Sequence, residues 1–163
     1  MQSGLALRSL VARSITADNF KPYGQVIFPT ADDQTFGAES AQLQLQNGIP
    51  RFYIMQLRHR GRCFSRITRH YQCTQCLGSL EGKSWLLAVA PPMPTASPEL
   101  SAIEAFEIPG RCFVKLAVGT WHAGPYFDDE TVSFYNLELS DTNIADHDTC
   151  NLQAQHGVSF EII

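Results

Sequence analysis

The chain has 163 residues, a length that fits one domain with a sizeable hydrophobic core. Its 12 basic and 16 acidic residues give a net charge of −4, and no run of lysine or arginine is long enough to follow a phosphate backbone, so we expect no nucleic-acid partner. Five cysteines at scattered positions argue against a disulfide framework and suit a reducing compartment. We therefore predict a single domain over residues 1–163 and a cytoplasmic location.

The N-terminal stretch MQSGLALRSLVARSITADNF contains short apolar pieces interrupted by Arg8 and Arg13. It lacks the continuous apolar core of a secretory signal and the length of a membrane span, so we expect no membrane association. Near its end, Thr16 is placed to cap a short helical turn, which Pro22 and Gly24 would terminate.

Most of the chain shows the period-two alternation of β-strands rather than the 3.6-residue period of helices. The alternating runs are short, rich in aromatic or β-branched residues and separated by turn residues. Seven strands are predicted on this basis, at 51–58, 62–68, 75–80, 83–90, 103–108, 111–118 and 131–139. The pattern indicates an all-β sandwich or barrel with few short helices.

The connections carry turn residues where the chain must reverse. Glycine supplies positive φ and aspartate supplies local hydrogen bonds in three short turns, at 81–83, 109–110 and 128–130. Two longer segments, 29–40 and 90–101, are predicted to be surface loops, the second because its four prolines exclude a central strand.

Side chains able to perform chemistry gather in two regions. In ITRHYQCTQCLGSLEG, Thr68 and His70 share one face of the predicted strand, and a turn over 71–74 would bring Gln75 back beside them. In GTWHAGP, glycines and a proline enclose His122, a side chain that exchanges protons near neutral pH. Two motifs with this spacing that converge inside one barrel are typical of a cupin.

Two other groups of potential ligands receive a structural interpretation. Cys73 and Cys76 lack a second pair, and residues three apart in a strand point to opposite faces, so we predict core thiols rather than a zinc site. The acidic segment 141–151, which includes His147, lacks EF-hand spacing and is predicted to be a solvated loop or a C-terminal connector. In 131–139 both faces carry one large aromatic residue, so the sequence leaves open which face lies inside.

Four motifs, RHYQCTQCLGSLEG, GTWHAGPYF, SFYNLELSDTN and ADNFKPYGQVI, resemble the ureidoglycolate lyase family over about residues 16–148. The resemblance is most specific at Thr74-Gln75 and Trp121-His122. It implies a cupin-like (jelly-roll) β-barrel, a homodimer, and cleavage of ureidoglycolate to glyoxylate and urea in allantoin and purine degradation. This chain differs from the bacterial members that it resembles at two places. They carry Glu-x-His where it has Thr68-Arg69-His70, and His-Arg where it has Ala117-Val118.

The reaction that this resemblance implies requires a base for the substrate hydroxyl, an acid for the departing urea nitrogen, and a group that holds the carboxylate. We expect His70 and His122 to share the acid–base work. The expected substrate-binding residues are Gln75 as an orienting amide, Lys115 as the carboxylate partner if it points inward, Thr68 and Trp121. The two histidines, Gln75 and Lys115 also have structural interpretations, as buried histidines, a paired amide and a solvated lysine.

A bound divalent metal such as Mn²⁺ is the natural alternative in a cupin. His70, Gln75 and His122 would be its ligands, but an amide oxygen is a weak ligand, and metal cupins usually offer three nitrogens and a carboxylate. We therefore expect neither metal nor organic cofactor. Two alternatives stay open: a metal-dependent oxygenase or isomerase, and a non-catalytic cupin that binds a small carboxylate.

Overall fold

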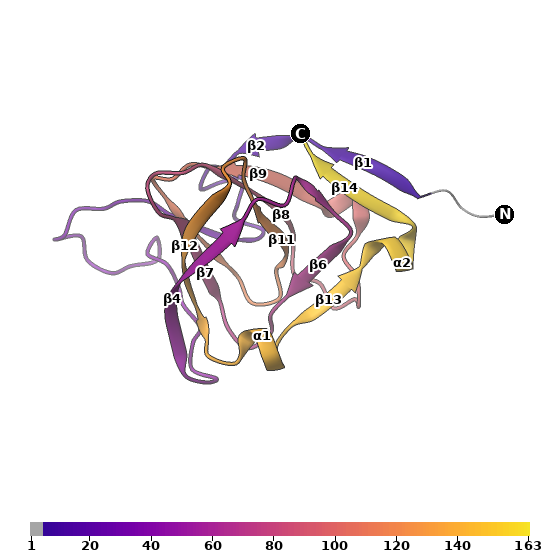
Figure 1. The fold of residues 1–163 in the computed structure, drawn as a ribbon. Coiled ribbons are helices and arrows are strands. Elements are labelled where there is room, and N and C mark those ends of the chain that lie inside the picture. The colour runs from indigo at the N-terminus through magenta and orange to yellow at the C-terminus, as the bar shows by residue number, and fades with distance from the viewer. Residues whose placement is uncertain (1–4) are drawn as a thin grey trace.

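The computed structural model describes residues 5–163 as two large β-sheets that face each other, with a third, smaller sheet beside them (Figure 1). Residues 1–4, the start of the stretch expected to have no membrane association, lie outside the described residues. The five-stranded sheet has the order β3 (Gly24–Ile27), β10 (Phe113–Leu116), β7 (Gln75–Ser79), β12 (Thr131–Leu139) and β4 (Pro50–Arg58). The six-stranded sheet has the order β13 (Asp148–Asn151), β6 (Arg66–Arg69), β11 (Trp121–Tyr126), β8 (Trp85–Ala90), β9 (Glu104–Ile108) and β2 (Ala12–Ser14).

The all-β prediction is confirmed, whereas the closed barrel is not. Within residues 5–163 the two large sheets keep separate hydrogen-bond ladders, and each ends in two edge strands. Pairing inside them is antiparallel except between β2 and β9. The observed architecture is therefore a two-sheet sandwich, and the cupin jelly-roll stays an implication of the resemblance.

The three short turns predicted from glycine and aspartate each carry the chain from one large sheet to the other. They link β7 to β8, β9 to β10 and β11 to β12, so they gather at one end of the sandwich. Glu81 and Gly82 adopt positive φ of 60° and 67° in the first turn. A Cβ on Gly110 in the second would lie 2.1 Å from the carbonyl carbon of Gly82, so these two turns touch through bare backbone.

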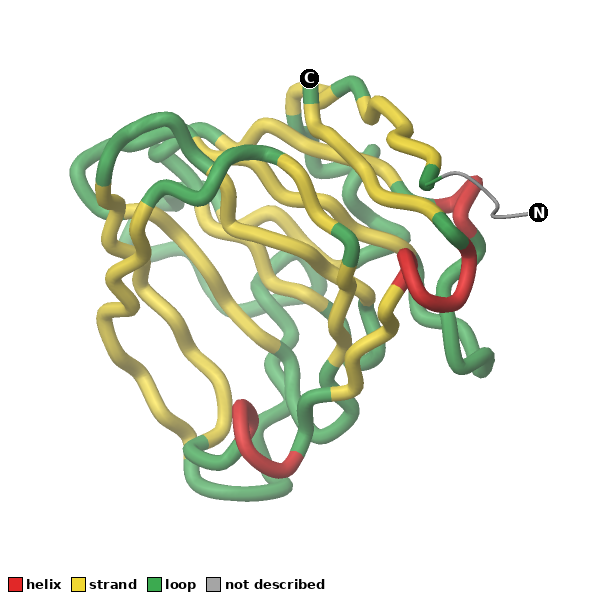
Figure 2. Tube along the Cα trace, turned by 45° about the vertical axis from the view of Figure 1, so that its right-hand side comes forward, coloured by secondary structure: helices red, strands yellow, loops and turns green. Residues whose placement is uncertain are grey.

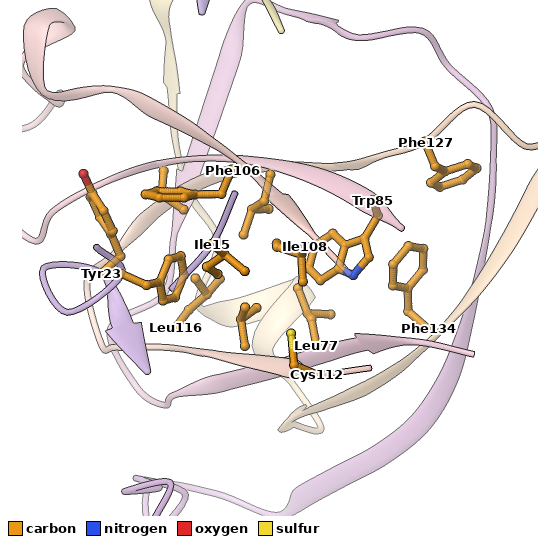
Figure 3. Close-up of a cluster of buried hydrophobic side chains, with 14 of the residues drawn as sticks. Ile15, Tyr23, Leu77, Trp85, Phe106, Ile108, Cys112, Leu116, Phe127 and Phe134 are labelled. Atoms are coloured by element: carbon orange, nitrogen blue, oxygen red, sulfur yellow. The ribbon is translucent and has the colours of Figure 1, made fainter. Parts of the chain in front are cut away.

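The main hydrophobic core lies between the two large sheets (Figure 3). Alternate residues of β8 point into it, and Trp85 meets Phe134 of β12 edge to face at a centroid separation of 5.2 Å. Phe127 packs on Phe134 at 5.8 Å. Each of these buried aromatic rings contributes roughly 1.5–3 kcal/mol by leaving water, so this part of the sandwich supplies much of the stability.

A second core covers the outer face of the six-stranded sheet. It is closed by a three-stranded sheet of order β1 (Ala6–Leu10), β14 (Val158–Ile162) and β5 (Cys63–Phe64), and by helix α2 (Leu152–His156). Asn151 caps α2 by accepting from the backbone N–H of Ala154, and Gly157 ends it at φ 64°. Figure 2 shows how little of the chain is helical: α2, α1 (Thr142–Ala145) and the 3₁₀ turn Leu100–Ala102.

Most predicted strands are present, with corrections at their ends. The strands at 51–58 and 131–139 correspond to β4 and β12, but 62–68 is interrupted at Ser65 into β5 and β6, and His70 lies just beyond β6. The turn at Thr16 is present, since its hydroxyl accepts from the backbone N–H of Asn19. The long loops are confirmed apart from the 3₁₀ turn.

Three further expectations have clear outcomes. Cys73 and Cys76 are buried, and all five cysteines of residues 5–163 are free thiols, as predicted. Of the two alternatives for 141–151, the solvated loop is wrong, because α1 and β13 lie in this segment and Asp146 is buried, and the segment connects β12 to the C-terminal elements. Among the helices of the described chain, none has the length and apolarity needed to cross a membrane.

Candidate active site

The inner face of β12 changes character along its length. Phe134 belongs to the main core, but Asn136 and Glu138, the next two residues on that face, are polar and only 1% exposed. This end of the sandwich lies beside α1, away from the three short turns (Figure 1). The face of 131–139 that the sequence left undecided therefore carries buried polar groups into the interior.

A hydrogen-bonded network joins three strands at this end. Gln75 of β7 donates through Nε2 to Asn136 Oδ1 and to Glu138 Oε2, both at 3.1 Å. The Tyr53 hydroxyl of β4 donates to Glu138 Oε1 at 3.1 Å and accepts from Asn136 Nδ2 at 2.9 Å. Burial, and secondly the charge of Glu138, raise the pKa of Tyr53, so the phenol remains a donor to the carboxylate.

Opposite this network, two histidine rings lie side by side on the six-stranded sheet. The ring centroids of His70 and His122 are 5.0 Å apart, and a third ring, that of the exposed His147, lies 5.7 Å from His70. His122 stands in β11 directly across from Thr68 of β6, which brings the two sequence motifs together as predicted.

Backbone carbonyls fix which nitrogen of each ring carries the proton. His70 Nδ1 lies 2.5 Å from the carbonyl oxygen of Asp146, and His122 Nδ1 lies 3.3 Å from that of Thr120. Because a carbonyl only accepts, each neutral ring carries its hydrogen on Nδ1 and leaves Nε2 as an acceptor. Neither Nε2 has a hydrogen-bond partner within the part of the chain that the structure describes.

Burial keeps both rings neutral near pH 7. It lowers the pKa of His122 to about 3, helped by the proximity of His70. Burial also lowers the pKa of His70, but the hydrogen bond to Asp146 opposes that effect. His70 is therefore the more basic of the pair.

Asp146 positions the turn that follows His70. Its carboxylate accepts from the backbone N–H groups of Tyr71 and Gln72, both at 2.7 Å, while its carbonyl holds the His70 ring. The turn over 71–74 then returns the chain into β7 at Gln75, as the sequence spacing predicted. Asp146, a residue of segment 141–151, thus holds His70 and the first two residues of the turn in place.

Lys115 and Trp121 are not brought into this site. The neighbours of Lys115, Val114 and Leu116, point into the main core, so Lys115 points to the outer face of its sheet, where its Nζ donates to the carbonyl of Gln42 at 3.1 Å. The expectation that it points inward is wrong, and so is the alternative that it faces solvent, because it is 7% exposed. Burial lowers its pKa.

Trp121 lies on the face of β11 opposite to His122. It is fully buried in the second core, where the Arg69 guanidinium stacks 4.0 Å from its ring centroid. Arg69 also donates to Asp148 at 2.7 Å, so this buried cation is already paired. Thr68, by contrast, lies beside the histidines, and its hydroxyl is 2.9 Å from that of Thr149.

Sequence reasoning missed the polar residues that face the histidines, Tyr53, Asn136 and Glu138, and the positioning residue Asp146. The signal was present in SFYNLEL, where Asn and Glu follow Phe at two-residue intervals on one face. The residues were missed because the opposite face, with Tyr135 and Leu137, is as apolar as the inner one.

The expected metal ligands offer two imidazole nitrogens and one amide oxygen. Across residues 5–163, no group of three or more His, Cys, Asp or Glu side chains is arranged to hold a metal ion. The donor set therefore does not fit the three nitrogens and a carboxylate that metal cupins use. Whether the protein requires a metal stays a prediction to be tested.

Three cavities of the described chain lie away from the histidines. One of about 230 Å³ is lined by Arg62, Trp85, Glu107 and Asp128, at the end of the sandwich that carries the short turns. Arg62 and Asp128 form an ion pair there at 2.5 Å. His70, Gln75 and His122 each retain a little exposed surface, between 5% and 9%.

Taken together, the fold and the site define an all-β protein whose interior end presents two neutral imidazoles to a buried amide and carboxylate. A model of the family described as ureidoglycolate lyase matches residues 36–159, which include His70, Gln75, His122 and Glu138. The chain belongs to the ureidoglycolate lyase family. A comparison with curated proteins gave no significant match.

Proposed function

We propose that this protein is an enzyme that cleaves ureidoglycolate to glyoxylate and urea, as its family membership suggests. The observation that carries the proposal is the His70–His122 pair, with both Nδ1 atoms held by carbonyls and both Nε2 atoms free to accept. Allantoin degradation would be the corresponding pathway. The homodimer and the cytoplasmic location stay predictions.

Neutral imidazoles suit this reaction because it needs no net acid. The base removes the proton of the substrate hydroxyl, the oxygen electron pair forms the C=O bond of glyoxylate, and the C–N bond breaks with its pair on nitrogen. The same proton then completes urea. One imidazole can therefore accept a proton from oxygen and return it to nitrogen, without beginning the cycle charged.

His70 is the better candidate for the proton carrier. Its pKa is lowered less strongly than that of His122 by the surroundings, because the Asp146 carbonyl stabilises the imidazolium that forms when Nε2 accepts a proton. His122 then accepts a hydrogen bond from the substrate and orients the hydroxyl toward His70. Gln75 orients the other end of the substrate from the facing sheet.

The test is the release of urea and glyoxylate from racemic ureidoglycolate by metal-stripped protein and by protein supplied with Mn²⁺. Wild-type protein should release both products, and His122→Ala should lower the rate by about 100-fold or more. His156→Ala is the matched control, because His156 is an exposed histidine in α2. Release no faster than the uncatalysed rate in every sample would refute the proposal.

A non-catalytic role in binding a small carboxylate is the second candidate. Two observations favour it. Ala117 and Val118 provide no ionisable group at the positions where bacterial lyases carry His-Arg, and Lys115 points to the outer face of its sheet. Thermal stabilisation by ureidoglycolate or glyoxylate without product formation would support this role over the lyase.

A further inference from the structure

Gln75 carries an acceptor that the protein leaves unused. Both hydrogens of its Nε2 are donated, to Asn136 and to Glu138, which fixes the orientation of the amide. Its Oε1 is buried and has no hydrogen-bond partner within residues 5–163. A buried acceptor without a donor is costly, so a ligand that supplies an N–H here would recover that free energy.

Glu138 adds a buried carboxylate that has only neutral donors. Gln75, Tyr53 and Asn143 donate to its two oxygens at 3.1–3.2 Å. Among the described residues, no lysine, arginine or histidine forms an ion pair with it. Arg51, the cross-strand partner of Glu138, places its guanidinium 3.7 Å from the Tyr53 ring centroid, so it stands near the carboxylate without forming an ion pair with it.

The groups that face one another at this end are thus mainly acceptors. Gln75 Oε1 and the Glu138 carboxylate stand on one sheet, and the Nε2 atoms of His70 and His122 on the other. Of the cations near this end, Lys115 lies on the outer face of its sheet and Arg69 is paired with Asp148. Arg51 is exposed and stacks on the Tyr53 ring at the border of the network. These acceptors match an uncharged group rich in N–H donors better than a carboxylate, which offers no donor to any of them.

We propose that this inner end binds the ureido group of the substrate, with Gln75 Oε1 and the Glu138 carboxylate accepting from its N–H groups. The substrate carboxylate then points outward, past the exposed ring of His147. This inference rests on the proposed function and deepens it. It makes Gln75 and Glu138 the residues that select a carbamoyl nitrogen over a methyl group of the same size.

A pair of unreactive probes tests this selection by isothermal titration calorimetry. N-carbamoylglycine is ureidoglycolate without its hydroxyl, and N-acetylglycine replaces the terminal NH₂ of that probe by a methyl group. Wild-type protein should bind N-carbamoylglycine roughly tenfold or more tightly, because the acetyl probe leaves the buried acceptors unpaired. Equal affinities, or binding of neither probe, would overturn the inference.

Variants locate the preference. Gln75→Leu removes the unpaired acceptor and Glu138→Gln removes the carboxylate, so each should reduce the preference to about twofold or less. Glu130→Gln, at an exposed position in the β11–β12 turn, should retain it in full. Circular dichroism establishes that each variant is folded, and the wild-type comparison of the two probes stands even if one variant is not. A preference that persists in both folded variants would contradict the assignment.

The probes also separate this inference from the lyase activity. A preference for N-carbamoylglycine without any cleavage of ureidoglycolate would support the ureido site and refute the proposed reaction. Cleavage of ureidoglycolate without the preference would overturn the ureido site and leave the reaction standing.

Discussion

The two ends of the sandwich are built from the same strands and differ in chemical character. Along the inner face of β12, Phe134 packs against Trp85 in the main core, whereas Asn136 and Glu138 further along carry a polar network to the histidines. The first end excludes water with large rings. The second end buries a carboxylate that forms no ion pair among residues 5–163 and an unpaired amide oxygen, both of which oppose folding.

This contrast separates the end of the sandwich that supplies stability from the end where we propose the active site. The apolar end tolerates little change, because its side chains and turns are in close contact. The polar end retains a buried amide oxygen, Gln75 Oε1, that has no donor within residues 5–163. Changes at the first end should therefore lower the free energy of unfolding, whereas changes at the second should alter activity or pH dependence.

The largest loss of stability is expected at the apolar end. Phe134→Ala should lower the free energy of unfolding by about 3–5 kcal/mol, because it leaves a cavity between Trp85 and Phe127. Denaturation by guanidinium chloride measures this loss. Tyr135→Ala, on the opposite face of the same strand and half-buried, is the matched control and should lose clearly less. Equal losses would contradict the assignment of Phe134, rather than Tyr135, to the main core.

The contact between two turns gives the next largest effect. Gly110→Ala should cost about 1–3 kcal/mol, because the new methyl group would meet the backbone of Gly82 at 2.1 Å. Gly37→Ala is the control, since a Cβ there meets nothing within 4 Å, and it should change stability by less than about 0.5 kcal/mol. Thermal denaturation of both variants measures the two losses of stability. A stable Gly110→Ala protein would contradict the close approach of the turns.

The polar end should make the free energy of unfolding depend on pH. The pKa of His122 is about 3 in the folded protein and near 6.5 when unfolded, so the unfolded chain binds more protons between these values. Stability from this residue is fully present above about pH 6.5 and is lost as pH falls, at up to about 1.4 kcal/mol per pH unit.

Guanidinium denaturation at pH 7 and pH 5 measures that slope. His122→Asn should flatten it, whereas His156→Asn, which changes an exposed histidine, should leave it unchanged. If wild type and His122→Asn lose stability equally on acidification, the ring is not buried as described.

The smallest effect is expected at Lys115. Its buried ammonium has a backbone carbonyl as its partner rather than a carboxylate, so Lys115→Met should change stability by less than about 1 kcal/mol. Because the side chain points away from the histidines, turnover of ureidoglycolate should also be unchanged. A large rise in KM would restore Lys115 as the carboxylate partner and contradict its outward direction.

The sequence predicted the parts of the fold that depend on local pattern. Strong alternation located β4 and β12, and the spacing around His70 and His122 correctly predicted that these two residues meet. The short strands β1 and β2 were not predicted, because they are stabilised by parallel pairing with β14 and β9, far away in sequence.

The direction of single side chains was harder to predict. Lys115 was expected inside because period two gives alternation but not its phase, and the loop segment that covers it through Gln42 carries no local sign of doing so. Glu138 was missed for the same reason. The facing sheet decides which side of β12 is interior, and that information is not contained in the strand itself.

The central claim is that the polar end is the active site, and His70 tests it most directly. We would measure ureidoglycolate turnover and the free energy of unfolding for His70→Gln beside His156→Gln. The account predicts that turnover falls by roughly 100- to 10,000-fold in His70→Gln alone, while both variants remain folded. Equal turnover in the two folded variants would place the chemistry elsewhere in the molecule.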